Sequence, residues 1–436
     1  MGKYHLTPSE APARRMFDGK LNVVRTDACI NCGHCITACV YDVHARREDD
    51  IRLMDEPNSE SCHACFRCIT ECPVGAIEVM PSRLYAGSVE QLDGKEVATL
   101  LFEASTGRVP VTGAGYGGAF SGEGFDGIWT DMSEIVRPTR DGIHGREYIS
   151  TTVQLGHRPK SMLDLLDGND KLMLTDISFP VMFGMMPAPL YNETVQQCVL
   201  DAACQLGTLA IVSPPILEQF PSYAPWMVPS VSNKEVADGV NTMELDAELV
   251  LDGGLIGDVL TIARLPPKKD VEGVVDSVLD MVDAGAHAVH IVADNTGMLK
   301  DAHITEVLRH VHQRLIDEGK RESLSILAEG GITLAEHVPK SLLCGADAVV
   351  IDTAYLVALE YMLPEQPPSS SHVDMEWGVA RIRNLMCSWR DQLLEVAGAM
   401  GIRDVRRIRG EFGRMLLHEE LEHEFVEMCG FEGGKR

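Results

Sequence analysis

Short apolar runs and amphipathic stretches alternate through the middle of the chain. The runs FPVMFGM, TLAIVS, HAVHIVA, LSILAEG and ADAVVID all lie between Phe179 and Asp352, and many of their residues are β-branched. Runs of this length and composition are typical of strands buried on both faces of a parallel sheet. The pattern therefore predicts a set of buried parallel strands.

The segments between these runs have the period of amphipathic helices. Two segments, 271–285 and 302–319, each place their apolar residues on one helical face. Glycine readily adopts the left-handed backbone that ends many helices, so Gly285 and Gly319 are predicted to terminate them. Strands that alternate with helices predict an α/β fold, a (β/α)8 TIM-like barrel over 151–365.

Eight of the 13 cysteines form two copies of the spacing C-x2-C-x2-C-x3-C. The first copy is Cys29, Cys32, Cys35 and Cys39, and the second is Cys62, Cys65, Cys68 and Cys72, followed by Pro73. The spacing resembles that of bacterial two-cluster ferredoxins, in which the fourth cysteine of each copy ligates the other cluster. Zinc sites also use C-x2-C pairs, but zinc leaves the repeated third and fourth cysteines unexplained.

We therefore predict two [4Fe–4S] clusters with crossed ligand sets. The first set is Cys29, Cys32, Cys35 and Cys72, and the second is Cys62, Cys65, Cys68 and Cys39. With a small α+β ferredoxin-like domain in front of the barrel, the chain divides into five parts. They are an N-terminal tail (1–20), the ferredoxin domain (21–82), a Gly-rich connecting segment (83–150), the barrel (151–365) and a C-terminal helical extension (366–436).

Charge and hydropathy exclude several classes of partner. The chain has 38 Lys+Arg against 65 Asp+Glu, a formal charge of −27, which repels nucleic acid. Residues 1–20 mix charged and apolar residues without a signal-peptide core, so we expect a cytoplasmic protein. The most apolar later stretch, 346–363, contains three acidic residues, so no membrane insertion is predicted.

Several barrel motifs resemble the FMN-binding barrel of the glutamate synthase family, chiefly its shorter archaeal-type enzymes with an attached two-cluster ferredoxin. These motifs are FPVMFGMMPAPL (Phe179–Leu190), AEGGI, GADAVVIDTAYLVAL (Gly345–Leu359) and the C-terminal stretch Asn384–Gly410. The resemblance implies that electrons pass through iron–sulfur centres to FMN at the barrel mouth. It also implies reduction of 2-iminoglutarate, which forms from 2-oxoglutarate and ammonia.

Phosphate groups bind in such barrels at the loops after the last two strands. The candidate cofactor-binding residues are Gly184, Met185, Gly330, Gly331, Asp352 and Thr353. Asp352 departs from the family pattern, because a carboxylate beside a phosphate dianion repels it. His287 and His290, in the run HAVH, are predicted to point to opposite faces of a strand, and a core histidine is favoured over a catalytic one. The arginine-containing loop Arg137–Ile149 either binds a carboxylate, a phosphate or a partner or is simply exposed.

Two functions remain open from the sequence. The chain is either an iron–sulfur oxidoreductase subunit of the glutamate-synthase type or a non-catalytic electron-relay or assembly subunit whose barrel has lost substrate and FMN binding. Both hypotheses imply a redox partner protein or further subunits of a larger oxidoreductase. No catalytic residue is assigned by the sequence.

Overall fold

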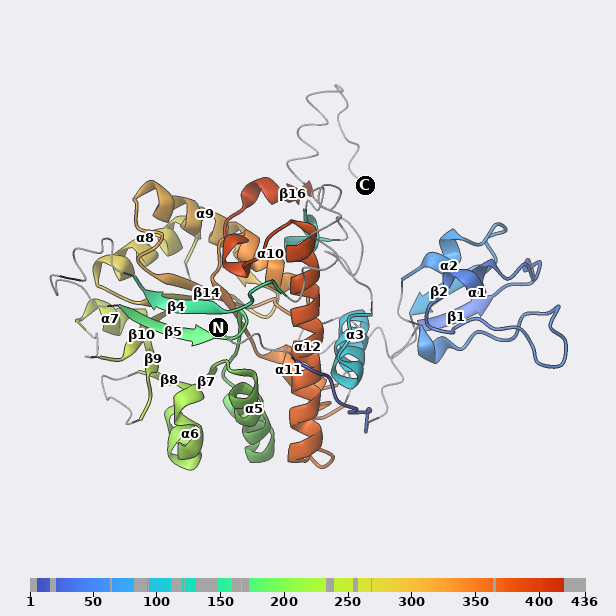
Figure 1. Ribbon diagram of the computed structural model, residues 1–436, viewed down its shortest axis with the longest axis horizontal. Helices are drawn as coiled ribbons and strands as arrows, with labels where there is room; N and C mark the ends of the chain where they lie inside the picture. Colours follow the sequence, from blue (N-terminus) through green and yellow to red (C-terminus); the bar gives the residue numbers. More distant parts are fainter. Residues whose placement is uncertain are drawn as a thin grey trace, which may run out of the picture.

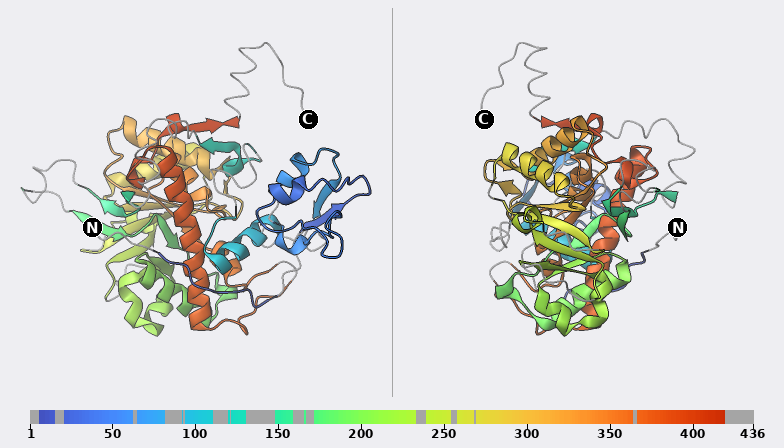
Figure 2. Two further views of the ribbon diagram at one scale, coloured as in Figure 1. Left: turned by 45° about the vertical axis from the view of Figure 1, so that its right-hand side comes forward. Right: turned by 90° about the vertical axis from the view of Figure 1, so that its left-hand side faces the viewer.

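The structure is a computed structural model of the chain, drawn in Figures 1 and 2. It describes residues 6–15, 21–62, 65–81, 92, 94–110, 120, 122–130, 148–158, 166, 172–232, 239–253, 258–267, 269–363 and 366–418. No helix in these ranges is long and apolar enough to cross a membrane.

A small module built from residues 21–81 carries the cysteine repeats (blue in Figure 1). Strands β1 (Leu21–Arg25) and β2 (Ile77–Pro81) pair antiparallel, with Val23 opposite Val79. The short helices α1 (His34–Ala38) and α2 (Arg67–Thr70) each follow the second cysteine of a repeat. This arrangement surrounds the cysteines with a small apolar core.

Eight described strands close a parallel barrel in chain order. They are β6 (Val181–Phe183), β7 (Ala210–Val212), β8 (Met227–Val231), β9 (Thr242–Asp246), β10 (Leu260–Leu265), β11 (Ala288–Val292), β14 (Ser325–Glu329) and β15 (Ala348–Ile351). The last strand pairs with the first, with Val349 opposite Val181. The predicted fold class is therefore confirmed, and each of the five apolar runs contains a barrel strand.

Helices follow the strands and cover the barrel. They are α5 (Glu193–Leu206), α6 (Pro214–Gln219), α7 (Ala247–Leu251), α8 (Val271–Asp283), α9 (Ile304–Asp317), α10 (His337–Leu343) and α11 (Thr353–Ala358). Helices α8 and α9 bury the apolar faces predicted for them. Gly285 and Gly319 follow these helices with positive φ angles of 85° and 65°, as predicted.

The N-terminal end of the barrel is closed by an antiparallel hairpin. It consists of β4 (Val153–His157) and β5 (Met173–Ile177), with Leu155 opposite Thr175. The Gly156 N–H donates to Ser325 Oγ at 2.9 Å, which attaches the hairpin to the start of β14. A Cβ at Gly156 would lie 2.0 Å from the Met173 carbonyl oxygen, so only glycine fits there.

The long helix α12 (Met375–Ala399) packs along α5 and α3 (Gly94–Thr106). Residues 6–15 run against α12, and Ala11 is fully buried there. Glu360 and Arg381 form an ion pair at 3.3 Å in which neither side chain has any exposed surface. A segment from the start of the chain therefore belongs to the core of the barrel domain.

The remaining elements are short. Two antiparallel two-stranded sheets are formed by β12 (Met298–Leu299) with β13 (Ala302–His303) and by β3 (Ile128–Thr130) with β16 (Met415–Leu417). Short 3-10 helices are Ser59–Ser61, Gly124–Gly127, Ala188–Leu190, Pro221–Trp226, Val405–Arg407 and Phe412–Arg414.

Candidate iron–sulfur module and barrel-mouth site

One cavity of the small module is lined by four cysteines from both repeats. These are Cys29, Cys32 and Cys35 of the first repeat and Cys72, the last cysteine of the second. The chain thus brings together the crossed set that the spacing predicts for one cluster. The cavity wall is otherwise mostly apolar, with Met54 and Ile77 among its residues. Four converging thiols in such a setting fit a [4Fe–4S] cluster.

The other four cysteines also lie together. Burial, followed by the negative charges of Cys62, Cys65 and Cys39, raises the pKa of the Cys68 thiol to about 11. Cys39 from the first repeat therefore lies with the second repeat, as the crossed pattern requires. Thiols packed this closely resist ionisation unless a cation balances them, and the iron of a cluster supplies that charge.

Backbone geometry shapes both cysteine loops in the same way. The residue after the second cysteine of each repeat is left-handed, with φ of 81° at Gly33 and 54° at Phe66, and a helix starts directly after it. The Asn31 N–H donates to Cys29 Sγ at 3.4 Å, and the Ala76 N–H donates to Cys72 Sγ at 3.2 Å. Hydrogen bonds to the sulfurs are one of the factors that set a cluster's reduction potential.

A buried group of charged side chains lies inside the barrel. His290 Nδ1 is 2.7 Å from Glu244 Oε2, and His290 Nε2 is 3.0 Å from Glu329 Oε2. Ser230 Oγ donates to Glu244 Oε1 at 2.7 Å, and Arg264 Nε lies 3.7 Å from the same oxygen. These five residues come from β8, β9, β10, β11 and β14. We call them the interior network.

The interior network holds its histidine in the charged form. Burial by itself lowers the pKa of His290, but Glu244 and Glu329 outweigh it and raise the pKa to about 9. For Glu244, burial favours the neutral acid, yet the neighbouring His290 holds its pKa below the ordinary value. His290 is 1% exposed, so it is the histidine of the run HAVH that faces the barrel interior. The sequence signal for the two glutamates of the network is a glutamate inside an apolar run: Glu244 in MELD and Glu329 in LAEG.

The predicted cofactor residues gather at the C-terminal end of three neighbouring strands. Gly184 and Met185 follow β6, Gly330 and Gly331 follow β14, and Asp352 and Thr353 follow β15. Since β14, β15 and β6 are adjacent in the barrel, their ends form one edge of its mouth. The Gly184 N–H donates to the Ile351 carbonyl at 2.6 Å.

The chain itself occupies the space next to these glycines. A Cβ at Gly330 would lie 2.5 Å from the Asp294 carbonyl oxygen, and one at Gly331 would lie 2.8 Å from the Gly297 backbone. The Asp352 carboxylate accepts the Thr353 N–H at 2.5 Å, at the start of α11. A phosphate would need this N–H and the space beside the glycines. The Thr353 N–H is therefore engaged by Asp352, and a flavin phosphate at this edge would have to displace that carboxylate.

One predicted feature lies largely outside the described residues, which exclude residues 137–147 of the arginine-containing loop Arg137–Ile149. Five cysteines lie outside the two repeats. Cys198, Cys344 and Cys387 are buried, Cys204 is partly exposed, and Cys429 lies outside the described residues.

A closed (β/α)8 barrel preceded by a module with two converging sets of four cysteines defines an iron–sulfur protein of the TIM-barrel class. Comparison with protein families agrees with both parts. Residues 21–73 match the 4Fe-4S dicluster domain, and residues 278–366 match the conserved region in glutamate synthase.

Relatives of this chain are similar over nearly their whole length. The archaeal-type glutamate synthase [NADPH] of Dehalococcoides mccartyi is 25% identical over 88% of this chain and 92% of its own. The archaeal glutamate synthase [NADPH] of Archaeoglobus fulgidus is 25% identical over 94% of this chain and 96% of its own. The chain is therefore similar to archaeal-type glutamate synthases over nearly its whole length, and its N-terminal part matches a 4Fe-4S dicluster domain. Among solved structures, a flavocytochrome b2 mutant with bound pyruvate aligns with a TM-score of 0.44 and 12% identity over 78% of this chain and 85% of its own.

Proposed function

We propose that this chain is an iron–sulfur oxidoreductase subunit of the glutamate-synthase type. Two [4Fe–4S] clusters, held by the crossed cysteine sets, pass electrons to the barrel, where an imine such as 2-iminoglutarate is reduced. The observation that carries the proposal is the cavity that joins Cys72 to the first cysteine repeat in a chain similar to glutamate synthases. This cavity supports two neighbouring clusters that relay electrons to an attached barrel.

One cysteine set of the ferredoxin module has a solvent-exposed member, and the other set lies next to the barrel domain. Cys32 of the first set is exposed, and the apolar side chains of Ile30 and Val74 beside it are 60% and 40% exposed. Cys62 of the second set shares a small apolar cluster with Ala98 of α3, which belongs to the barrel domain. We infer that a partner protein delivers electrons at the first cluster and that the second cluster faces the barrel.

The interior network supplies charges that suit imine reduction. Conversion of an imine to an amine consumes two electrons and two protons. Protonated His290 holds one proton between Glu244 and Glu329. Arg264, whose side chain is 32% exposed, offers a guanidinium to a substrate carboxylate at the same place. We propose His290 as the proton donor and Arg264 as a substrate-binding residue. Other subunits or the cytoplasm supply ammonia.

The family likeness implies FMN as the electron acceptor in the barrel, and FMN when bound would collect single electrons and deliver them as a pair. The Asp352 carboxylate on the Thr353 N–H favours the second candidate function, an electron-relay or assembly subunit without flavin. Reduced cysteines, which iron–sulfur ligation requires, suit the cytoplasm in either case.

Cofactor content separates the two functions. Anaerobically purified protein should contain about eight iron per chain. One released flavin per chain, together with glutamate formation from 2-oxoglutarate and ammonia under a chemical reductant, supports the enzyme. Full iron content without flavin or glutamate formation supports the relay subunit.

A matched pair of variants tests the cause of any flavin loss. If Asp352 excludes the phosphate, Asp352→Ser should increase the flavin retained after reconstitution. The control Asp317→Ser, at the end of α9, should leave flavin content unchanged. Equal flavin in both variants would show that Asp352 does not decide cofactor binding.

A further inference from the structure

A polar cavity lies at the N-terminal end of the barrel strands, next to Ser325 at the start of β14. It has a volume of about 320 Å³ and is lined by the hairpin strand β4, the start of β14 and the C-terminal segment 404–409. Four arginines and three carboxylates line it: Arg158, Arg406, Arg407 and Arg409 with Glu322, Asp347 and Asp404. Acidic residues outnumber basic ones 65 to 38 in the whole chain, so this cavity reverses the overall balance.

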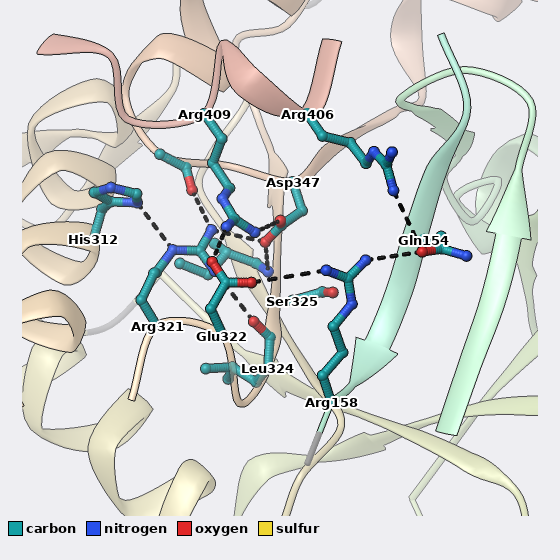
Figure 3. Close-up of polar contacts among 12 residues, drawn as sticks. Gln154, Arg158, His312, Arg321, Glu322, Leu324, Ser325, Asp347, Arg406 and Arg409 are labelled. Atoms are coloured by element: carbon teal, nitrogen blue, oxygen red, sulfur yellow. Dashed lines mark hydrogen bonds and ion pairs between the residues drawn. The ribbon is translucent and has the colours of Figure 1, made fainter. Parts of the chain in front are cut away.

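One part of this charge is structural. Asp347 is buried and accepts hydrogen bonds from Arg321 Nη2 at 2.8 Å, from Arg409 Nη1 at 2.7 Å and from the Ile326 N–H at 2.7 Å (Figure 3). Arg321 Nε also donates to His312 Nδ1 at 2.9 Å, so the guanidinium of Arg321 is held by both His312 and Asp347. The Asp347 carboxylate therefore pairs with Arg321 and Arg409 and holds both guanidinium groups in place.

The other arginines of the cavity are balanced to different degrees. Arg406 Nη2 forms an ion pair with Asp404 Oδ2 at 2.5 Å. Arg158 Nη2 and Arg406 Nη1 both donate to the neutral Gln154 Oε1, at 2.9 and 3.4 Å, so the two guanidinium groups lie within about 6 Å of each other. Figure 3 shows them extending toward Gln154 from different segments. The nearest carboxylate to Arg158 is Glu322, at 3.9 Å. Arg407 is exposed and has no ion pair or hydrogen bond within the described part of the chain.

We propose that this cavity binds a small metabolite with two or more negative oxyanion groups, either phosphates or carboxylates. Guanidinium groups pair with both kinds of group through two parallel N–H donors. The volume suits a molecule of metabolite size rather than a single ion. The ligand would give Arg158 a closer anionic partner than Glu322, share Arg406 with Asp404 and engage Arg407.

The site is separate from the proposed catalytic end. Ser325, at the cavity, begins β14, and Gly330 at the barrel mouth follows the end of the same strand. Five residues of strand span about 16 Å. Active sites of such barrels lie at the C-terminal face, so a ligand at the N-terminal face is an effector and not the substrate. This inference is independent of whether the barrel is catalytic.

Direct binding tests the proposal on the full, anaerobically purified protein. Isothermal titration in a chloride buffer would use pyrophosphate, adenosine monophosphate, citrate and 2-oxoglutarate, which separates phosphate from carboxylate ligands. At least one probe should bind saturably with Kd below about 1 mM. Absence of any such binding would overturn the proposal.

Variants assign the binding to this cavity. The double variant Arg158→Gln with Arg406→Gln should weaken the best probe by about tenfold or more, because two charge-assisted contacts are lost. Arg314→Gln, an exposed arginine of α9 paired with Glu318, is the control and should bind as the wild type does. If the double variant loses iron or helical content, the exposed Arg407→Gln replaces it and should also weaken binding. Unchanged affinity in a folded variant would refute the site.

Discussion

The crossed ligand assignment can be tested with two double variants of the ferredoxin module. Each removes two cysteines, and both share the exposed Cys32, whose replacement disturbs little packing. In Cys32→Ala with Cys72→Ala, both lost thiols line the same cavity. In Cys32→Ala with Cys39→Ala, the two come from the same repeat, but Cys39 lies with Cys68 and its neighbours.

The expected iron content follows from counting the remaining ligands. With crossed sets, the Cys32/Cys72 variant retains one complete set of four cysteines and should hold about four iron per chain, half of the roughly eight of the wild type. The Cys32/Cys39 variant leaves three cysteines in each set, so it should hold no complete [4Fe–4S] cluster. Iron and sulfide analysis with low-temperature electron paramagnetic resonance of the reduced protein measures both quantities.

The control is Cys387→Ala in α12, a buried cysteine far in sequence from both repeats, which should keep the full iron content. An uncrossed module would give the reverse result. The Cys32/Cys39 variant would then keep one intact cluster, and the Cys32/Cys72 variant would keep none. That outcome would refute the ligand assignment and the interpretation of the cavity.

Three further predictions concern buried charges. His290, with its pKa raised to about 9, stabilises the fold below pH 6.5 and loses this contribution as the pH rises through 9. The free energy of unfolding should therefore change with pH by an amount on the order of 3 kcal/mol. Glu244→Gln should reduce this change, as measured by urea unfolding followed by tryptophan fluorescence. An unchanged pH dependence in the variant would contradict the prediction. Asp347→Asn removes a charge partner from both Arg321 and Arg409 and should lower the free energy of unfolding by about 3 to 5 kcal/mol. A loss below about 1 kcal/mol would show that Asp347 and these two arginines are not tightly coupled. Glu360→Gln removes the carboxylate that accepts backbone N–H groups of residues 14 and 15, so limited proteolysis should cut the 6–15 segment faster than in the wild type; equal rates would argue against this anchoring role.

The sequence alone determined the features that depend on local order along the chain. Strand and helix periodicity identified the barrel, because buried parallel strands require continuous apolar runs and their covering helices require one apolar face. The cysteine spacing identified the two-cluster module, since a cubane takes three ligands from one short loop. Glycines after α8 and α9 marked the helix ends because they adopt positive φ.

Tertiary structure alone decided which distant residues meet. Glu244, His290 and Glu329 lie 39 or more residues apart in the chain, and only the closure of the barrel brings both carboxylates within 3.0 Å of His290. The arginines around Asp347 meet because the hairpin, two strand starts and the C-terminal segment converge on one end of the barrel. Local periodicity predicts which face of an element is buried, whereas the charge partner across that face depends on how the elements pack.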